Sequence, residues 1–454
     1  MKLTNTLTGQ KEDFTPQFDP VRMYVCGVTP YDDSHIGHAM SSIVFDVVRR
    51  YLEFRGYNVN HVMNFTDVDD KLIARAERLQ VPVLELAERY ITRFHEGMDS
   101  LNILRATEYP RVSQMIPEIV ELIQTIIAKG SAYEAHGDVY FRIQSFPTYG
   151  KLSHRTLDGM QAGARIDVDE EKENPMDFAL WKAAKPGELS WPSPWGEGRP
   201  GWHIECSAMS MKYLGDTIDI HGGGQDLIFP HHENEIAQSE AATGQQPFVR
   251  YWLHNGLLRL GEEKMSKSLG NLVTIQEVLT NHSADALRLF VLSSGYRSPL
   301  TYTTESLDAA QKGADRLTDA LRTDTPNENA GTLDVIGYRQ RFIDAMDDDL
   351  NSAQGIAILF DLAKEINRGR EAGANVTMAQ LELRELANVL GLKLEPTEQA
   401  SLGNATPFIE LLIEVRNELR KKREFGIADL VRDQLAERGV LLEDSANGTT
   451  WRSK

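Results

Sequence analysis

Two short stretches of the sequence combine residue types that bind phosphate. His-Ile-Gly-His at residues 35–38 follows the apolar run 23–28 and a loop of Pro, Asp and Ser residues, and an apolar pattern with helical spacing continues after it. This order predicts a strand, a loop and a helix. Exposed N–H groups and the helix dipole favour phosphate at such a turn. We therefore expect His35, Gly37 and His38 to face a nucleotide.

The second stretch, Lys-Met-Ser-Lys-Ser at residues 264–268, lies in a loop after the apolar run 252–260. Two lysines on a loop can close over a triphosphate as point charges. Each stretch is short enough to occur by chance, but the two motifs together are specific. Lys264 and Lys267 are therefore predicted to stabilise charge on the phosphate chain.

The chain has two cysteines, Cys26 and Cys206. A structural disulfide is unexpected because we see no secretion signal, and two buried free thiols are the simplest alternative. Their surroundings favour a metal instead. Pro230 can begin a helix on which His231 and Glu235 are i and i+4, so both side chains can reach one ion. Cys, Cys, His and Glu together suit Zn²⁺.

Two features of this ligand set leave alternatives open. His232 lies about 100° around the helix from His231, which makes it the weaker ligand candidate. A closed set of four ligands is typical of structural zinc rather than of a reactive centre. The carboxylate of Glu235 is the hardest of the four ligands, so it could yield to an incoming thiolate.

The composition limits the class of protein. A length of 454 residues predicts three or more domains, and 41% apolar and 25% charged residues are typical of a soluble globular protein. No apolar run approaches the roughly 20 residues that span a bilayer, and we expect a cytoplasmic protein without membrane contact. The net charge of −19 confines nucleic-acid contact to local basic faces. One such face is predicted near the C-terminus: Arg416, Arg420, Lys421, Lys422 and Arg423.

The remaining pattern predicts an α/β core followed by helices. A second strand is expected at 59–65, with Thr66 or Asp67 capping the helix after it. A helix, short strands and a Pro/Trp-rich passage interrupt this core at 116–129, 138–143 and 191–196. Later helices are expected at 283–294, 305–322, 339–367, 377–390, 408–423 and 427–437, with a strand at 440–442.

Five motifs occur in this order along the chain: YVCG, HIGH, GWHIECSAM, HGGGQDLIFPHHENE and KMSKSLGN. Together they resemble the motifs of the cysteinyl-tRNA synthetase family of class I aminoacyl-tRNA synthetases. The resemblance covers nearly the whole chain. It implies an α/β fold in which a doubly wound (Rossmann-type) parallel-sheet catalytic domain is split by a connective insertion and followed by an α-helical bundle and a small C-terminal anticodon-binding module. The implied parts are the first half of the Rossmann catalytic domain at 1–115, the connective insertion at 116–198, the second half at 199–262, the KMSKS loop and stem-contact region at 263–305, the helical bundle at 306–395 and the anticodon-binding module at 400–454.

The resemblance also implies an ATP-dependent cysteine-tRNA ligase. Such an enzyme activates L-cysteine with ATP and Mg²⁺ to cysteinyl-adenylate and pyrophosphate, and then transfers cysteine to the 3′-terminal adenosine of tRNA(Cys). In the family one zinc is held by residues that match Cys26, Cys206, His231 and Glu235, and it binds the substrate thiol. A pocket separates near-isosteres by only about 1–3 kcal/mol, so the soft zinc–sulfur bond selects cysteine over serine. We expect a monomer.

The resemblance also assigns roles to individual site residues. The expected catalytic residues are His35, His38, Lys264 and Lys267. These four are expected to contact ATP together with Gly37, Gly222, Gly223 and Gly224, because glycine lets the backbone approach adenosine closely. The expected cysteine pocket is Thr66, Trp202, His203, His221 and Asp226, although Trp202 could be core and His221 a satisfied polar residue. The expected anticodon contacts are Arg420, Phe425, Asp429 and Asp444.

Two other functions stay open. A cysteine ligase with an amino-sugar acceptor would share the activation chemistry but lack the full anticodon module, so residues 400–454 argue against it. A zinc protein that only binds RNA would not need both HIGH and KMSKS. A persulfide-forming activity proposed for some family members needs paired lysines, and Lys-Leu-Ile-Ala at 71–74 lacks the second, so we do not expect it.

Overall fold

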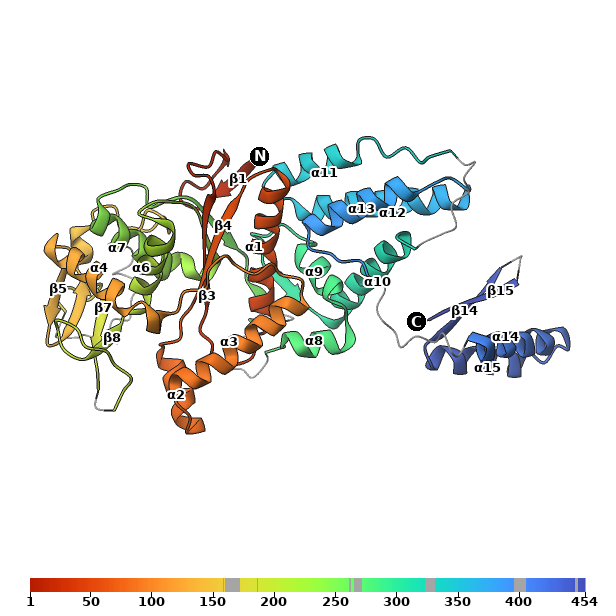
Figure 1. Ribbon diagram of the computed structural model, residues 1–454, viewed down its shortest axis with the longest axis horizontal. Helices are drawn as coiled ribbons and strands as arrows, with labels where there is room; N and C mark the ends of the chain where they lie inside the picture. The colour runs from red at the N-terminus through yellow and green to blue at the C-terminus, as the bar shows by residue number, and fades with distance from the viewer. Residues whose placement is uncertain are drawn as a thin grey trace. The chain divides into compact units, whose positions relative to one another are not determined.

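The structure of the chain is a computed structural model. It describes residues 1–157, 159, 172–185, 187–260, 263–264, 272–322, 331–395, 406–445 and 448–453. The chain divides into two compact units, Met1–Leu394 and Glu395–Lys454 (Figure 1). No helix within the described ranges combines the length and the apolar character needed to cross a bilayer.

A four-stranded parallel sheet forms the centre of the first unit. Its strands, in spatial order, are β10 (Val249–Asn255), β9 (Ile218–Gly224), β3 (Val21–Val28) and β4 (Val59–Phe65). Successive side chains of a strand point to opposite faces. Accordingly, Met23 and Val25 pack into one apolar cluster and Tyr24 into another. The predicted parallel α/β core is therefore confirmed.

Helices cover both faces of this sheet. The helix α1 (Ile36–Phe54) packs on one face, while α6 (Trp202–Leu214) and α7 (Glu233–Thr243) belong to the cluster on the other. The predicted strand, loop and helix between residues 23 and 52 are present as β3 and α1. Two layers of helix around a parallel sheet make the doubly wound arrangement expected from the sequence.

The chain between β4 and β9 leaves the sheet. It contains α2 (Asp70–Leu79), α3 (Val83–Ser100), α4 (Ile116–Ala128) and the antiparallel sheet of β5 (Ala132–Ala135), β6 (Asp138–Phe141), β7 (Phe178–Ala183) and β8 (Gly198–Pro200). The predicted helix at 116–129 is present. The strand predicted at 138–143 is β6, which ends at Phe141.

The predicted cap of α2 was wrong. Asp69, and not Thr66 or Asp67, accepts a hydrogen bond at the N-terminus of α2, from Lys71 N at 2.8 Å. Asp67 is occupied elsewhere, because its carboxylate accepts from the backbone N and the hydroxyl of Ser113. A partner 46 residues away in sequence therefore decides which aspartate is free to cap.

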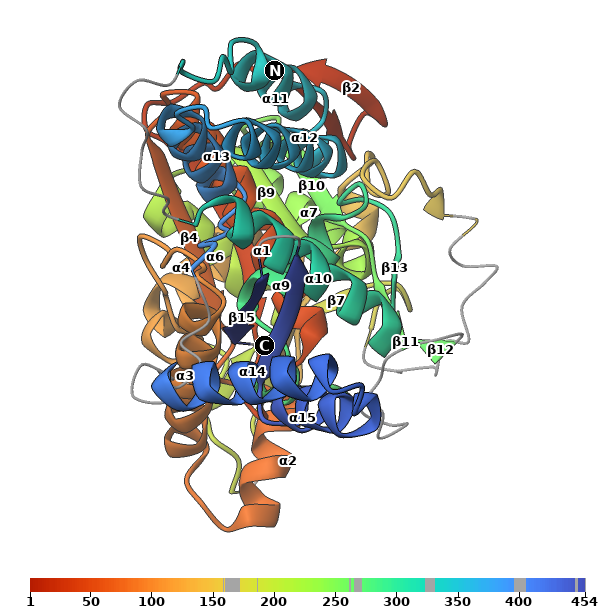
Figure 2. The same cartoon turned by 90° about the vertical axis from the view of Figure 1, so that its right-hand side faces the viewer.

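Helices dominate the rest of the first unit. A small sheet joins β11 (Leu258–Leu260) and β12 (Glu263–Lys264) to β13 (Leu300–Tyr302), which follows α8 (Ile275–Asn281) and α9 (Ala284–Leu292) in the chain. After β13 come α10 (Thr304–Ala320), α11 (Tyr338–Asp347), α12 (Ser352–Glu371) and α13 (Thr377–Val389). The helices α11, α12 and α13 lie side by side (Figures 1 and 2). The helix α1, which packs on the central sheet, also contacts both α9 and α13.

The helical pattern predicted at 339–367 is interrupted. Asp349 and Leu350 have φ of 64° and 54°, in the left-handed region, and they separate α11 from α12. The carboxylate of Asp349 accepts hydrogen bonds from Thr4 N and Thr4 Oγ1, at 2.7 and 2.6 Å. The turn therefore binds the N-terminal hairpin of β1 (Lys2–Asn5) and β2 (Gln10–Asp13).

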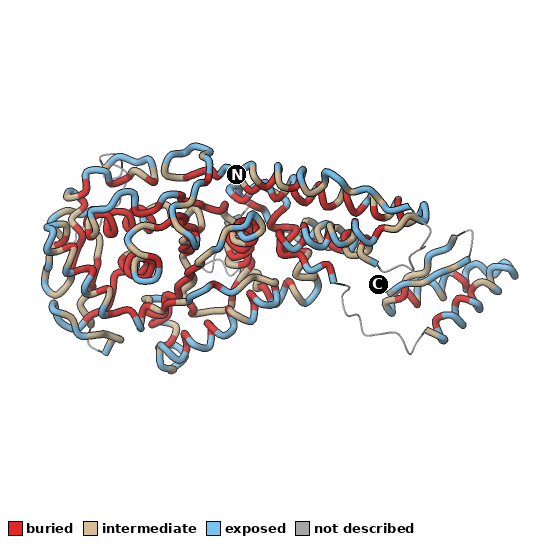
Figure 3. The backbone as a smooth tube through the Cα atoms, turned by 45° about the horizontal axis from the view of Figure 1, so that its top comes forward, coloured by how far each residue is buried: buried red, intermediate tan, exposed pale blue. Residues whose placement is uncertain are grey.

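The second unit is small. It contains α14 (Thr406–Lys421), α15 (Phe425–Glu437), β14 (Val440–Ser445) and β15 (Gly448–Ser453). The helical pair and the first strand were predicted, whereas β15 was not. Its core has few members, namely Ile409, Ile413, Leu435 and Val440. Figure 3 shows how much of both helices is exposed, and Arg416 joins α14 to Asp444 of β14 by two hydrogen bonds of 2.9 and 2.8 Å.

The packing of the bundle gives a stability prediction. Leu362 of α12 is 0% exposed, whereas Leu381 of α13 is 54% exposed. Leu362→Ala should lower the free energy of unfolding by about 2–5 kcal/mol, because it removes buried methyl groups and leaves a cavity. Leu381→Ala, the matched control, should change it by less than about 0.5 kcal/mol. Urea denaturation followed by circular dichroism measures both, and equal losses would contradict the packing.

Candidate metal centre and nucleotide site

Five potential metal ligands meet beside the carboxyl end of β3. Cys26 lies near the end of that strand, Cys206 lies on α6, and Glu235 lies in the first turn of α7. His231 and His232 end the irregular turn before α7. The structure thus brings together the four residues that the sequence suggested as ligands, together with His232.

The donor atoms of this cluster are close to one another. Cys26 Sγ lies 3.8 Å from Cys206 Sγ and 3.6 Å from Glu235 Oε1. Glu235 Oε1 lies 3.0 Å from His231 Nε2. Zinc–ligand bonds of about 2.0–2.3 Å place tetrahedral donors about 3.3–3.8 Å apart. The donor atoms of Cys26, His231, His232 and Glu235 all lie within 4.8 Å of one another, and Cys206 adjoins this group through Cys26, so the cluster can hold one Zn²⁺ ion.

His232, predicted to be the weaker ligand candidate, nevertheless lies in one group of possible metal ligands with Cys26, His231 and Glu235. His232 Nε2 lies 3.3 Å from Cys26 Sγ and 3.9 Å from Glu235 Oε1. Glu235 is i+4 from His231 but i+3 from His232, and both spacings place side chains on one helix face. The carboxylate therefore projects between the two imidazoles. His232 Nδ1 in turn lies 2.7 Å from His254 Nε2 on β10.

The charges of the cluster suit a cation. Burial raises the pKa of Cys26, whereas the hydrogen bond from Cys26 lowers the pKa of Cys206 to about 6, so the pair holds one thiolate near neutral pH. Burial opposes ionisation of His231, but Glu235 and Cys206 raise its pKa to about 10. Burial likewise opposes ionisation of Glu235, but His221 and His231 lower its pKa to about 2. A bound metal would displace the His231 proton.

Three of the five residues predicted to bind cysteine surround this cluster. The ring of Trp202 stacks on His231, with centroids 4.3 Å apart, and Trp202 remains 44% exposed. His203 Nδ1 lies 2.9 Å from His231 Nδ1, and His221 Nε2 lies 2.8 Å from Glu235 Oε2. The alternative that Trp202 belongs to the core is therefore excluded.

The other two pocket candidates have different surroundings. Thr66 is buried and its hydroxyl accepts a hydrogen bond from Asn64 Nδ2 at 3.2 Å. Asp226 is exposed in a short turn after β9. Sequence reasoning missed Glu205, which is 1% exposed; burial first, and then nearby Cys206, raise its pKa well above the usual range. Glu205 occurs within GWHIECSAM, but nothing local in that motif signals a buried neutral acid.

The HIGH segment begins α1, as predicted. His35 caps this helix, since its Nδ1 accepts hydrogen bonds from Gly37 N at 3.1 Å and His38 N at 3.4 Å. The rings of His35 and His38 stack with centroids 3.7 Å apart. Two N–H groups expected to meet phosphate are thus capped by the motif's own imidazole.

The backbone that follows KMSKS is bonded to the HIGH segment. Ile36 N donates to Val273 O and Ile275 N donates to Ser34 O, both at 3.0 Å. Lys264 pairs through its backbone with Arg259 in the β12–β11 ladder. Lys267 lies outside the described residues, as does the side chain of Lys264. Both ends of the lysine stretch are nevertheless attached near α1.

The triple glycine has a packing role that the sequence did not predict. A Cβ at residue 222 would overlap the ring of Phe45 on α1. A Cβ at residue 223 would lie 2.9 Å from both Leu227 and His232. These close approaches within the protein already require glycine, so the contact of these residues with adenosine stays a prediction.

The predicted anticodon residues occupy the second unit. Asp444 accepts a hydrogen bond from Arg420 Nη1 at 2.7 Å in addition to those from Arg416. Asp429 pairs with Arg432 at 3.3 Å. Phe425 is 56% exposed, so its ring is accessible to a stacking partner.

Comparisons with known proteins agree with this geometry. Residues 15–312 match the family model described as the catalytic domain of class I (C) tRNA synthetases, and residues 341–395 match the DALR domain. A protein of Dehalococcoides mccartyi named cysteine-tRNA ligase is 58% identical over 456 residues, which cover 100% of both chains. One of the same name from Chromohalobacter salexigens is 52% identical and covers 99% of both.

A solved structure shares the fold. Mycobacterium tuberculosis methionyl-tRNA synthetase in complex with methionyl-adenylate superposes with a TM-score of 0.61, over 87% of this chain and 94% of that one. Its sequence is 17% identical, so the likeness concerns the fold alone.

The cluster predicts tight binding of one zinc ion per chain. His231→Asn should weaken zinc binding by more than about 100-fold, because loss of a ligand should exceed the usual effect of an outer partner. His136→Asn is the matched control, since His136 is exposed and its φ of 54° is one that Asn tolerates. Competition with a chromophoric chelator measures both variants.

The same titration has a predicted pH dependence. Zinc affinity should fall throughout the range from pH 8 to 5, because the ion must displace the His231 proton, and it should fall more steeply below about 6, where Cys206 takes up its proton. A zinc affinity that is independent of pH between 5 and 8 would contradict thiolate ligation.

Proposed function

The chain belongs to the cysteine-tRNA ligase family of class I aminoacyl-tRNA synthetases, and on that premise we propose that it joins L-cysteine to tRNA(Cys) at the expense of ATP. The observation that carries the proposal is the cluster of Cys26, Cys206, His231 and Glu235, in which Cys26 lies on β3, the strand that precedes α1. It supplies a thiol-binding centre next to a turn suited to phosphate.

The metal centre selects the amino acid. When bound, Zn²⁺ supplies a soft site that favours the sulfur of cysteine over the oxygen of serine. Cys26, Cys206, His231 and Glu235 hold it, while His221 holds the second oxygen of Glu235 at 2.8 Å. A pocket alone would separate these two substrates by only about 1–3 kcal/mol, so the donor set provides the discrimination.

Neighbouring side chains shape the pocket. Trp202 covers His231 and keeps one face accessible to solvent, which suits it to lie against the substrate. His203 orients His231 through their 2.9 Å contact. Thr66 and Asp226 take the polar groups of cysteine, with Asp226 facing the ammonium as an exposed carboxylate.

Activation takes place at the start of α1. The carboxylate of cysteine attacks the α-phosphorus of ATP, which binds with Mg²⁺, and pyrophosphate leaves. His35, His38, Lys264 and Lys267 stabilise the charge on the phosphoryl group. The terminal ribose hydroxyl of tRNA then attacks the activated carbonyl, the acyl–phosphate bond breaks and AMP leaves, and we assign no protein base to that step.

The second unit reads the tRNA. Phe425 is exposed for stacking on a base, and Arg420, Asp429 and Asp444 lie within the same small unit. The DALR model matches residues 341–395, which contain α12, α13 and most of α11. Because tRNA is the substrate, we place the activity in the cytoplasm, carried out by a monomer.

Cysteine-dependent exchange between ATP and pyrophosphate tests the proposed function. The zinc-loaded protein should catalyse exchange with cysteine and at least about 10³-fold less with serine, because serine lacks the soft donor atom. Removal of zinc should abolish the cysteine-dependent rate, and restored zinc should recover it. Absence of exchange from folded, zinc-loaded protein would refute the proposal.

The KMSKS lysine gives a second test. Lys267→Ala should lower the rate of exchange by about 10²–10³-fold, since one charge on the transferring phosphoryl group is lost. Lys129→Ala, which removes an exposed lysine after α4, is the control and should leave exchange unchanged. Zinc content should be normal in both proteins. A full exchange rate in Lys267→Ala would remove this residue from the mechanism.

A further inference from the structure

A buried arginine joins several helices behind the HIGH helix. Arg288 lies in the middle of α9 and is 0% exposed. Its guanidinium donates to Leu390 O and Leu101 O, both at 2.9 Å, and to Asp46 Oδ2 of α1 at 2.5 Å. Leu390 and Leu101 are the C-caps of α13 and α3, where the helix dipoles are negative. A buried charge is costly without such partners, so these acceptors fix Arg288.

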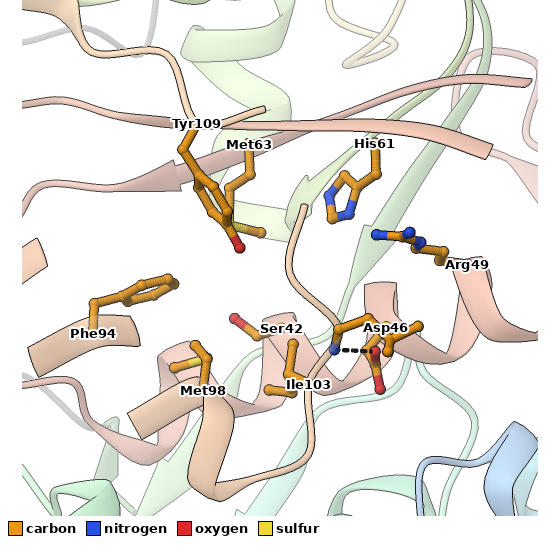
Figure 4. A pocket seen from close by; sticks show the side chains of 10 residues that line it. Ser42, Asp46, Arg49, His61, Met63, Phe94, Met98, Ile103 and Tyr109 are labelled. Carbon is orange, nitrogen blue, oxygen red and sulfur yellow. Dashed lines mark hydrogen bonds between the residues drawn. The ribbon is translucent and has the colours of Figure 1, made fainter. Parts of the chain in front are cut away.

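Asp46 uses both carboxylate oxygens. Oδ1 accepts from Leu104 N at 2.9 Å, and Oδ2 accepts from Arg50 Nε at 2.8 Å as well as from Arg288. Figure 4 shows Asp46 at the edge of a cavity that is also lined by Ser42 of α1. The cavity is small, so the buried side chains of α1 and the carboxylate bonds of Asp46 hold this face of the helix together.

The same network reaches the last residues of the first unit. Asn102 Nδ2 donates to Gly391 O at 2.8 Å. Asp285 of α9 accepts from Lys393 N at 2.9 Å and from Leu394 N at 2.8 Å. Leu394 is the last residue of the first unit. The segment that leads into the C-terminal unit is therefore bonded to α9, one turn from Arg288.

We propose that Asp46 and Arg288 are positioning residues for cysteine activation. They set where α1 holds His35 and His38, and they tie that placement to the segment 388–394. The inference rests on the proposed function. Asp46 lies about 12 Å along α1 from His38, at 1.5 Å per residue, and a continuous helix transmits a displacement over that distance as a rigid element.

Gly391→Ala tests the proposal without altering α1 or the site. A Cβ at residue 391 would overlap the Arg288 guanidinium, so the substitution displaces it. Gly373→Ala is the matched control, because Gly373 has φ of +78° against +70° for Gly391 but faces open space. Both substitutions carry the backbone strain of a positive φ, and only one reaches Arg288.

The kinetics of pyrophosphate exchange distinguish a positioning effect from a general loss of stability. Gly391→Ala should raise the KM for ATP or lower kcat, so that kcat/KM for ATP falls by about 10- to 100-fold. The KM for cysteine and the zinc content should stay unchanged. These last two depend on β3, α6 and α7 rather than on α1. Gly373→Ala should match the unmodified protein. An unchanged KM for ATP and kcat in Gly391→Ala, or equal losses for both substrates, would overturn the proposal.

A second variant and a binding measurement complete the test. Arg288→Lys keeps the charge but lacks the fork that reaches three acceptors, so it should show the same split if Gly391→Ala does not fold. Calorimetric binding of a non-hydrolysable ATP analogue needs no catalysis. If the unmodified protein shows no exchange, the proposed function fails. Weaker analogue binding confined to Gly391→Ala and Arg288→Lys would then still support the positioning role, and unchanged binding would overturn it.

Discussion

A carboxylate that is 0% exposed must be neutralised where it lies, and Glu235 is such a group. Its two oxygens contact His221 on β9 and His231 before α7, and Cys26 of β3 lies 3.6 Å away. An unpaired buried charge costs several kcal/mol, so the two strands and the helix must meet at this point. The carboxyl edge of a parallel sheet provides that meeting place. The sheet edge at which the fold brings these segments together is therefore also the place where the potential metal ligands meet.

The helix that carries HIGH is fixed from two sides. On the sheet side, the ring of Phe45 fits against Gly222 of β9, where no side chain would be accommodated. On the bundle side, Asp46 bonds to the buried Arg288. Adjacent residues of α1 thus face the strand beneath the metal cluster and the helices of the bundle. A shift of α1 would disturb close packing on one face and a buried ion pair on the other.

Local spacing was enough to predict part of this arrangement. Strand, loop and helix around HIGH follow from apolar periodicity, and the closeness of His231 to Glu235 follows from helical spacing. The position of His232 depended on where Glu235 projects, and the cap of α2 depended on Ser113 occupying Asp67. Such outcomes are decided by partners distant in sequence, which a local pattern does not contain.

The burial of a charged residue is harder still to predict from local sequence. Arg288 occurs in the apolar run Ala-Leu-Arg-Leu-Phe-Val-Leu, where an arginine is most simply interpreted as the exposed position of an amphipathic helix. Its acceptors come from α1 and from the ends of α3 and α13, so its burial exists only once four segments have assembled.

The two nucleotide motifs depend on a comparable assembly. Backbone bonds between residues 34–36 and 273–275 attach the segment that follows the lysine stretch beside the start of α1, and Lys264 pairs with Arg259 of β11, a strand that contacts α1. Segments more than two hundred residues apart in sequence thereby meet at this helix. Charge on a phosphate chain is stabilised best by groups already in place. The hydrogen-bonded backbone therefore supports the proposal that both motifs act on the same substrate.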